Sequence, residues 1–211
     1  MRLLAAVSLI AFFAAATPSV AQPAPGNPAT MTPAAPQSAP GMPAANQPNQ
    51  NDRLFVYEAT IGGKAEVEFG QIAEQKGRSQ AVKDFGRQMV TDHSKANQQL
   101  TQLAQAVNIP QPPDLDEEHN AMLRQLQNLS GGEFDLAYIR GQVAEHQKTV
   151  QLVEWEIGAG QDPQLKAFAS QVLPILYRHL DMARVVDNQL TATAAAPSSP
   201  ATPASGRPRT Q

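Results

Sequence analysis

The chain contains no cysteine, which excludes disulfide bonds, thiolate chemistry and a cysteine-linked lipid anchor. It is also poor in aromatic residues, with a single tryptophan, and has only four histidines among 211 residues. No apolar run reaches the roughly 20 residues that a membrane-spanning helix needs. We therefore expect a mature chain without a transmembrane segment, whose fold depends on a hydrophobic core alone.

The N-terminus has the three parts of a secretory signal peptide. Arg2 supplies the charged start, residues 3–16 are uncharged and mostly apolar, and a small-x-small cleavage site ends at Ala21. We expect a signal peptide at 1–21, cleaved near Ala21–Gln22. The expected location is therefore periplasmic or secreted.

Two low-complexity segments flank the centre of the chain. Residues 22–51 contain eight prolines and no charged residue, and residues 191–211 are rich in proline, alanine and serine. Such segments cannot bury enough apolar surface to offset the entropy of ordering. We expect a disordered linker at 22–51, one folded domain at 52–190 and a disordered tail at 191–211.

The expected domain at 52–190 is acidic. It holds 13 basic and 19 acidic residues, a formal charge of −6, and its basic residues form no cluster along any predicted helix. Nucleic-acid and anionic-lipid binders carry basic patches. The sequence therefore predicts no nucleic-acid partner, and most of the charge is interpreted as a solvated surface.

Apolar residues at alternating spacings of three and four predict helices throughout the domain, and no strand pattern competes with them. Asp52, Ser79 and Asp162 are the expected N-caps of the first, second and last long helices, and Pro174 is expected to kink the last one. The expected helices are 52–76, 79–107, a short one at 116–129, 133–159 and 163–190.

The connections between these helices predict the topology. Short turns join the first long helix to the second and the third to the fourth, whereas a connector of about 25 residues joins the second to the third. Residues 83–88 and 166–171 resemble each other, so the chain reads as two helical hairpins. We predict an all-α, ferritin-like four-helix bundle with a long crossover that carries the short extra helix.

Three histidines lie on the apolar seams of three different helices. His93, His146 and His179 each fall near the middle of a helix, and at a rise of about 1.5 Å per residue all three share one layer of the bundle. Glu66 and two glycines occupy this layer on the first helix, while Asp92 points toward the flank of its seam. Burying an unpaired imidazole costs free energy, so this layer needs partners or a ligand.

Two interpretations of the histidine layer remain open. The first is a transition-metal site for zinc, iron or copper, with His93, His146, His179 and Glu66 as hypothesised ligands. It requires ring nitrogens within about 4 Å of one another. The second is a buried polar network in which each histidine has its own partner, with separations near 10 Å allowed. His119, in an acidic run, is interpreted as a solvated surface residue.

Five separated motifs occur in the order found in one known family. In one-letter code they are AxxGGxAEVExG at 59–70, MVxDHSKAN at 89–97, SGxxFDxxY at 130–138, EHxxxV at 145–150, and LP followed by HL within 173–180. Across 54–190 the chain resembles the exported bacterial family catalogued as domain of unknown function 4142. The resemblance implies a ferritin-like helical fold in the cell envelope and implies no activity.

No catalytic constellation stands out in the sequence, so none of its residues is assigned a catalytic role. Di-iron ferritins use Glu-x-x-His pairs, but Val90, Val143 and Leu176 stand three residues before the seam histidines. We favour a non-enzymatic envelope protein with a structural, stress-related or interaction role and an envelope protein as possible partner. The alternative is a transition-metal-binding or redox bundle that uses the histidine layer; no other cofactor is implied.

Overall fold

A computed structural model describes residues 47–195, which form five helices and no strand. The helices are α1 (Gln50–Lys76), α2 (Gln80–Ala106), α3 (Glu117–Asn128), α4 (Gly131–Ala159) and α5 (Pro163–Ala195). The predicted all-α class is confirmed. Within the described range, no helix is long and apolar enough to cross a membrane. The expected signal peptide at 1–21 and most of the linker and tail lie outside the described residues.

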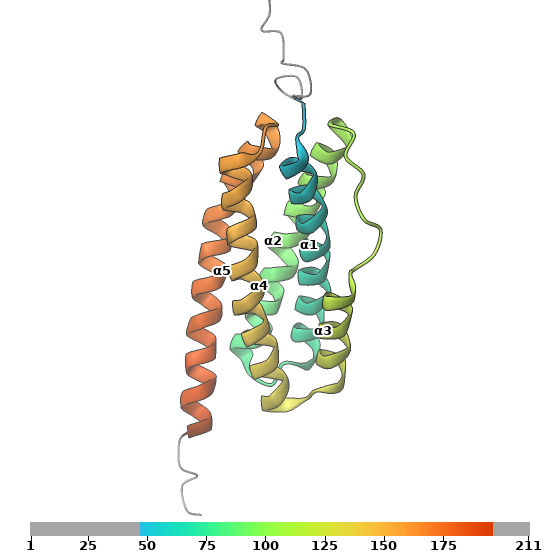
Figure 1. The fold of residues 1–211 in the computed structure, drawn as a ribbon. Coiled ribbons are helices and arrows are strands. Elements are labelled where there is room, and N and C mark those ends of the chain that lie inside the picture. Colours follow the sequence, from blue (N-terminus) through green and yellow to red (C-terminus); the bar gives the residue numbers. More distant parts are fainter. Residues whose placement is uncertain (1–46, 196–211) are drawn as a thin grey trace, which may run out of the picture. The chain divides into compact units, whose positions relative to one another are not determined.

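The four long helices form a bundle built from two hairpins (Figure 1). α1 packs against α2 and α4 packs against α5, while α1–α4 and α2–α5 contacts close the ring. Figure 1 shows the connector after α2 running along the outside of the bundle to α3, which packs against α1 and α4. The predicted ferritin-like bundle with a crossover and a short extra helix is therefore confirmed.

The ends of α1 and α5 differ from the predictions. Asn49, not Asp52, is the N-cap of α1: its side chain accepts hydrogen bonds from the amides of Asn51 and Asp52 at 2.8 and 3.0 Å. Asp52 returns a bond by accepting from the Asn49 amide at 2.6 Å, which completes a capping box. At the other end of the domain, α5 continues to Ala195, beyond the predicted end at 190.

The two other predicted N-caps behave differently from each other. Asp162 precedes α5 and accepts hydrogen bonds from the amides of Gln164 and Leu165 at 2.9 and 3.0 Å, so this prediction is confirmed. Ser79 stands at the N-cap of α2, but its side chain makes no capping bond within the described chain. The predicted start of α2 is therefore correct, but the predicted capping hydrogen bond from the Ser79 side chain is not formed.

Each hairpin turn is held by an aspartate from the other hairpin. Asp52, in the first turn of α1, accepts hydrogen bonds from the amides of residues 161–162 at 3.0–3.1 Å. Asp135, in the second turn of α4, accepts from the amides of residues 78–79 at 2.8–2.9 Å. Both aspartates are buried. The same device therefore joins the two hairpins at both ends of the bundle.

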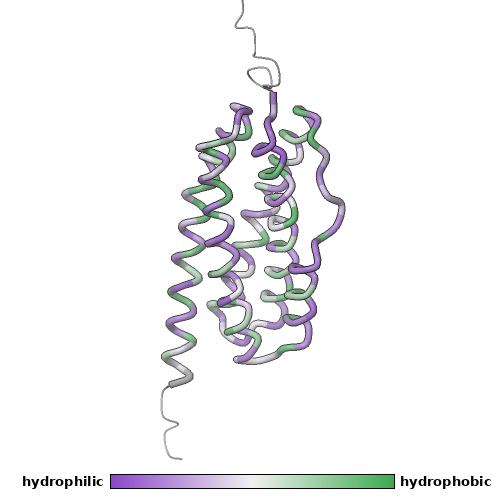
Figure 2. The backbone as a smooth tube through the Cα atoms, in the orientation of Figure 1, coloured by the Kyte–Doolittle hydropathy of each residue, from purple (hydrophilic) through white to green (hydrophobic). Residues whose placement is uncertain are grey.

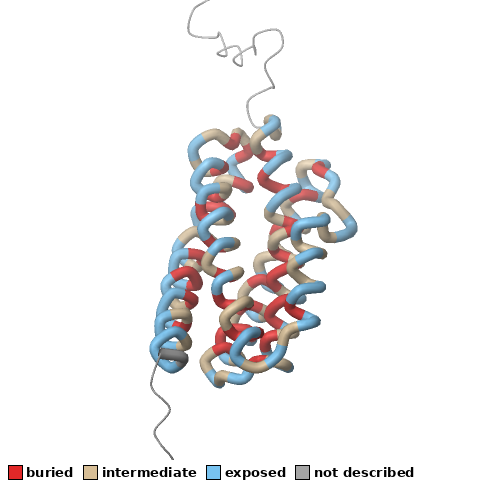
Figure 3. The backbone as a smooth tube through the Cα atoms, turned by 60° about the horizontal axis from the view of Figure 1, so that its bottom comes forward, coloured by how far each residue is buried: buried red, intermediate tan, exposed pale blue. Residues whose placement is uncertain are grey.

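The core consists of two apolar clusters. Along the long helices, buried residues alternate with exposed ones, as the tube coloured by hydropathy and the tube coloured by burial show (Figures 2 and 3). The first cluster contains Phe69, Phe85, Leu126, Phe134 and Tyr138, among others. The second cluster contains Phe55, Leu100, Val153, Leu165 and Phe168, among others. Along α2, α4 and α5 the three seam histidines lie between residues of the first cluster and residues of the second. A polar layer therefore divides the core.

Candidate metal centre

His93 of α2, His146 of α4 and His179 of α5 meet in the bundle interior. The three side chains are 9%, 1% and 1% exposed, because each histidine occupies an inward position of the apolar repeat on its helix. One ring nitrogen from each lies within 4.8 Å of the other two. This separation is slightly above the distance of about 4 Å that direct ligation of one metal requires. It is far below the separation of about 10 Å expected if each histidine had its own partner.

The closest contact joins His146 and His179, whose Nε2 and Nδ1 atoms lie 3.3 Å apart. The other nitrogen of each ring already has an acceptor. His146 Nδ1 lies 3.0 Å from the Gln142 carbonyl oxygen, and His179 Nε2 lies 2.8 Å from a carboxylate oxygen of Asp92. A carbonyl and a carboxylate only accept, so these outer nitrogens carry the hydrogens. In neutral rings the two facing nitrogens therefore both present lone pairs.

The pKa shifts favour neutral rings at all three positions. Burial lowers the pKa of His146 to about 4, with the neighbouring His179 adding to the effect. Burial also lowers the pKa of His179, although Asp92 opposes the shift, and it holds the pKa of His93 well below its usual value. An additional proton shared between His146 and His179 is therefore disfavoured at neutral pH. A metal cation between the lone pairs remains the simplest way to offset their repulsion.

The third ring fits the same interpretation. His93 Nε2 is buried and has no hydrogen-bond partner among residues 47–195. A tetrahedral metal with bonds of about 2.0–2.1 Å places its nitrogen ligands about 3.3–3.4 Å from one another. The His146–His179 pair meets this spacing at 3.3 Å. A ring nitrogen of His93 lies within 4.8 Å of the other two histidines and completes the set of three.

Asp92 is the functional residue that sequence reasoning missed as a partner. Its side chain crosses from α2 to His179 on α5 and also accepts a hydrogen bond from Gln88 at 2.7 Å. Burial opposes its ionisation, but hydrogen bonds from Gln88 and His179 together lower its pKa. Metal-ligating histidines commonly donate their other N–H to a carboxylate or a backbone carbonyl. His179 donates to the Asp92 carboxylate and His146 donates to the Gln142 carbonyl. The sequence feature that could have identified Asp92 is its position directly before His93.

Glu66 lies beside the three histidines but outside the group that converges. It is 5% exposed, and its Oε1 lies 3.8 Å from His146 Nδ1, the nitrogen that faces away from His179. Burial raises the pKa of Glu66 to about 8. Its Oε2 has no hydrogen-bond partner in the described part of the chain. The structure thus places a buried carboxyl group next to the candidate centre, without placing it among the ligands.

The fourth histidine belongs to a different environment, and its interpretation as a solvated surface residue was wrong. The His119 side chain is 12% exposed and lies between Asp116 at 2.6 Å and Glu145 at 3.5 Å. Its ring stacks on Phe69 with centroids 6.3 Å apart. The hydrogen bond to Glu145 is the main reason that its pKa rises to about 9. His119 is therefore cationic at neutral pH and unsuited to metal binding.

Comparison with known proteins supports the fold and identifies the family. The crystal structure of a DUF305 fragment from Deinococcus radiodurans is similar, with a TM-score of 0.60 and 12% identity over 69% of this chain and 99% of that chain. This likeness concerns the fold alone. No curated protein matches the chain. The family model described as "Domain of unknown function (DUF4142)" matches residues 37–186, and the chain therefore belongs to this family.

Proposed function

We propose that this protein binds one transition-metal ion through His93, His146 and His179. The observation that carries the proposal is the 3.3 Å contact between His146 Nε2 and His179 Nδ1, since the outer nitrogens of both rings already donate to fixed acceptors. Two imidazole lone pairs at this distance repel each other unless a cation lies between them. The partnerless Nε2 of His93 supplies a third donor from the facing helix.

The donor set indicates the class of metal. Three neutral imidazoles suit zinc, copper, iron or nickel, whereas magnesium and calcium prefer oxygen ligands. The Glu-x-x-His pairs of di-iron proteins are absent from these helices. We therefore propose a mononuclear site that carries, stores or senses such an ion, and no di-iron chemistry. The proposed setting is outside the cytoplasm, which the N-terminal sequence at 1–21 supports.

Metal binding is tested on protein purified without a histidine tag. Isothermal titration with Zn²⁺ and with Cu²⁺ is expected to give one ion per chain, and elemental analysis after dialysis measures the retained metal. His146→Ala is expected to abolish this binding. His119→Ala is the matched control, because His119 lies outside the cluster, and it should bind like the wild type. Equal binding by wild type and H146A would contradict the proposal.

The three histidines are expected to act as one unit. Residues that share a ligand show non-additive effects. The double variant H146A/H179A should therefore bind metal no more weakly than H146A alone, within the error of the titration. Independent contributions from each histidine would instead indicate separate surface sites.

A further inference from the structure

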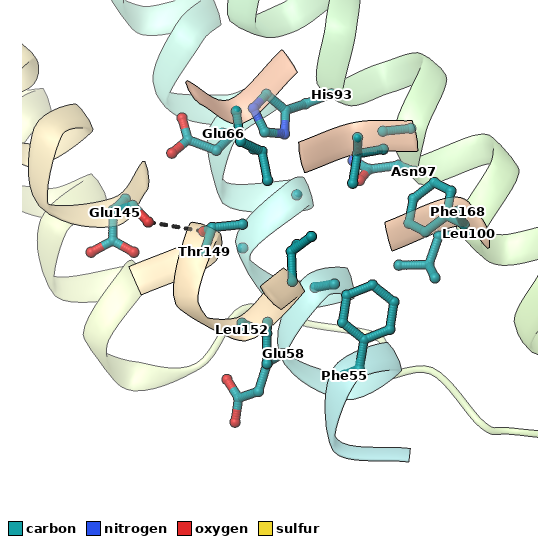
Figure 4. A pocket seen from close by; sticks show the side chains of 17 residues that line it. Phe55, Glu58, Glu66, His93, Asn97, Leu100, Glu145, Thr149, Leu152 and Phe168 are labelled. Atoms are coloured by element: carbon teal, nitrogen blue, oxygen red, sulfur yellow. Dashed lines mark hydrogen bonds between the residues drawn. The ribbon is translucent and has the colours of Figure 1, made fainter. Parts of the chain in front are cut away.

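A cavity of about 70 Å³ lies directly beside the candidate metal centre. Figure 4 shows His93 and Glu66 at one end of this cavity and Phe55 at the other. Most of the remaining wall is apolar and includes Leu100, Phe168 and Val172. The cavity is thus a mainly apolar chamber whose polar end is formed by one proposed metal ligand and one buried carboxyl group.

The lining of the cavity passes from the interior to the surface. His93 and Glu66 are buried, Leu152 and Thr149 are partly exposed, and Glu58 is exposed. The two partly exposed residues belong to α4, and Glu58 belongs to α1. A small molecule can therefore reach His93 from solvent between α1 and α4.

Three histidine ligands leave a metal ion with an unfilled coordination position. Protein zinc sites with four protein ligands are structural, whereas sites with three keep the fourth position for water or substrate. Within the described residues, the converging group contains three histidines and no fourth ligand. Glu66, whose Oε2 has no hydrogen-bond partner there, also lines the cavity, but its carboxyl lies on the Nδ1 side of His146, away from the converging nitrogens.

We propose that the cavity holds an exchangeable, monodentate ligand of the metal, bound at the fourth position on the side where His93 lines the cavity. The ligand class is water, hydroxide or a small molecule of up to three heavy atoms. A cavity of about 70 Å³ holds several water molecules but is smaller than the roughly 150 Å³ cavity that accommodates benzene. This inference rests on the proposed metal binding and assigns that site an open position.

The first test uses azide as the probe on wild-type protein loaded with one equivalent of Cu²⁺. We expect a saturable azide-to-copper charge-transfer band with one azide per copper. If copper binds through the histidines but azide produces no band, the open position is refuted while metal binding stands. If copper does not bind through the histidines, the proposed function fails and the inference fails with it.

The second test places a side chain in the cavity. Gly62 lines the cavity, and a Cβ added there meets no atom within 4 Å. Gly62→Leu therefore has room for its Cβ and should extend a side chain into the chamber, and leucine favours helix more than glycine does. We expect azide affinity to fall by at least about tenfold, since crowding a filled cavity is costly. Copper affinity should stay within about twofold, because no histidine moves.

The matched control is Gly158→Leu. Gly158 also has open space around its Cβ and lies within α4, but it does not line the cavity. This variant should bind copper and azide like the wild type, and thermal melts check that both variants remain folded. Undiminished azide binding by folded G62L would overturn the assignment of the ligand to this cavity. So would loss of azide binding in G158L to the same extent.

Discussion

At the scale of single residues, the decisive feature is that each ring's orientation is already determined. His146 donates to a helix carbonyl and His179 donates to Asp92, so neither ring can turn its N–H toward the other without losing a hydrogen bond, which is buried for His146 and partly buried for His179. Leaving a buried acceptor without its donor costs about 1–3 kcal/mol. The facing lone pairs are therefore a stable property of the fold, set before any ion binds.

The role assigned to Asp92 can be tested by a single change. Asp92→Asn removes the negative charge that receives the His179 N–H, and loss of such an outer partner typically lowers metal affinity by about 10- to 100-fold. Zn²⁺ titration measures the effect. Asp84→Asn, on the exposed side of the same helix and paired with Arg87, is the control and should leave affinity unchanged. Equal affinities of D92N and wild type would show that Asp92 does not support the site.

At the scale of elements, the helix ends show which local rules the fold uses. α5 begins with an aspartate that bonds to two of its amides, whereas Ser79 holds none of the amides of α2. The chain before α2 is fixed instead by Asp135 from α4. An N-cap residue therefore stabilises its helix only where its side chain accepts a hydrogen bond from an amide of the first turn.

The two caps should differ in their effect on stability. Asp162→Ala is expected to lower the free energy of unfolding by about 1 kcal/mol, as N-cap losses usually do. Ser79→Ala should change it by no more than a few tenths of a kcal/mol, because a hydroxyl without a capping bond contributes little. Urea denaturation compares the two variants with the wild type. A larger loss for S79A than for D162A would contradict this account of the caps.

The crossover is fastened by charged side chains. Lys64 donates to the carbonyl oxygens of Pro112 and Pro113 at 2.7 and 2.9 Å, and Lys76 donates to the carbonyls of residues 126–127 at the end of α3. His119 bonds to Asp116, the N-cap residue of α3, and pairs across to Glu145 of α4. These contacts attach a short, weakly buried helix to the bundle, and one of them depends on pH.

The His119 contact should weaken as the pH rises. Its folded-state pKa of about 9 lies above the ordinary value of 6.5, so its contribution is complete below pH 6.5 and is lost as pH rises through 9. A shift of this size in the pKa of His119 corresponds to about 3 kcal/mol of stability before solvent screening, which lowers the contribution well below that value. Hydrogen exchange of α3 at pH 6 and pH 9 measures the loosening. His119→Gln removes the titrating group and should flatten this difference; an unchanged difference in H119Q would assign it to other groups.

At the scale of the whole molecule, two hairpins are joined by reciprocal aspartates and by one shared polar layer. Asp52 holds the turn of the second hairpin and Asp135 holds the turn of the first. The three proposed ligands come from both hairpins, one from α2 and two from α4 and α5. Bound metal should therefore connect the hairpins at mid-height, between the two aspartate contacts.

The reciprocal aspartates should matter more than any helix cap. Asp135→Ala removes the charged acceptor of two partly buried amides and leaves a cavity at a buried position, and it is expected to cost on the order of 3 kcal/mol. Asp52→Ala should have a similar effect at the opposite end of the bundle. Asp187→Ala, a more exposed aspartate on α5 that pairs with Arg140, is the control and should cost less than about 1 kcal/mol. Thermal unfolding ranks the three, and equal effects would contradict the assignment.

The sequence predicted the parts of the fold that depend on repetition. Apolar spacing identified five helices, and connector lengths identified the crossover, because both follow from short-range geometry. Equal depth on three helices placed the three histidines in one layer, but it left open whether their rings converge. Contacts that depend on side-chain direction across helices could not be predicted. Examples are Asp92 reaching His179, Asp135 reaching the turn at 78–79, and His119 turning inward onto Phe69.

Diffraction from crystals of the zinc-loaded, untagged protein, with anomalous data collected at the zinc edge, tests the central claim most directly. The account predicts one anomalous peak inside the bundle, about 2.0–2.1 Å from a ring nitrogen of His93, His146 and His179. His146 Nδ1 and His179 Nε2 should keep their bonds to the Gln142 carbonyl and to Asp92. A protein that takes up zinc only at surface carboxylates, with no peak among the three rings, would contradict the account.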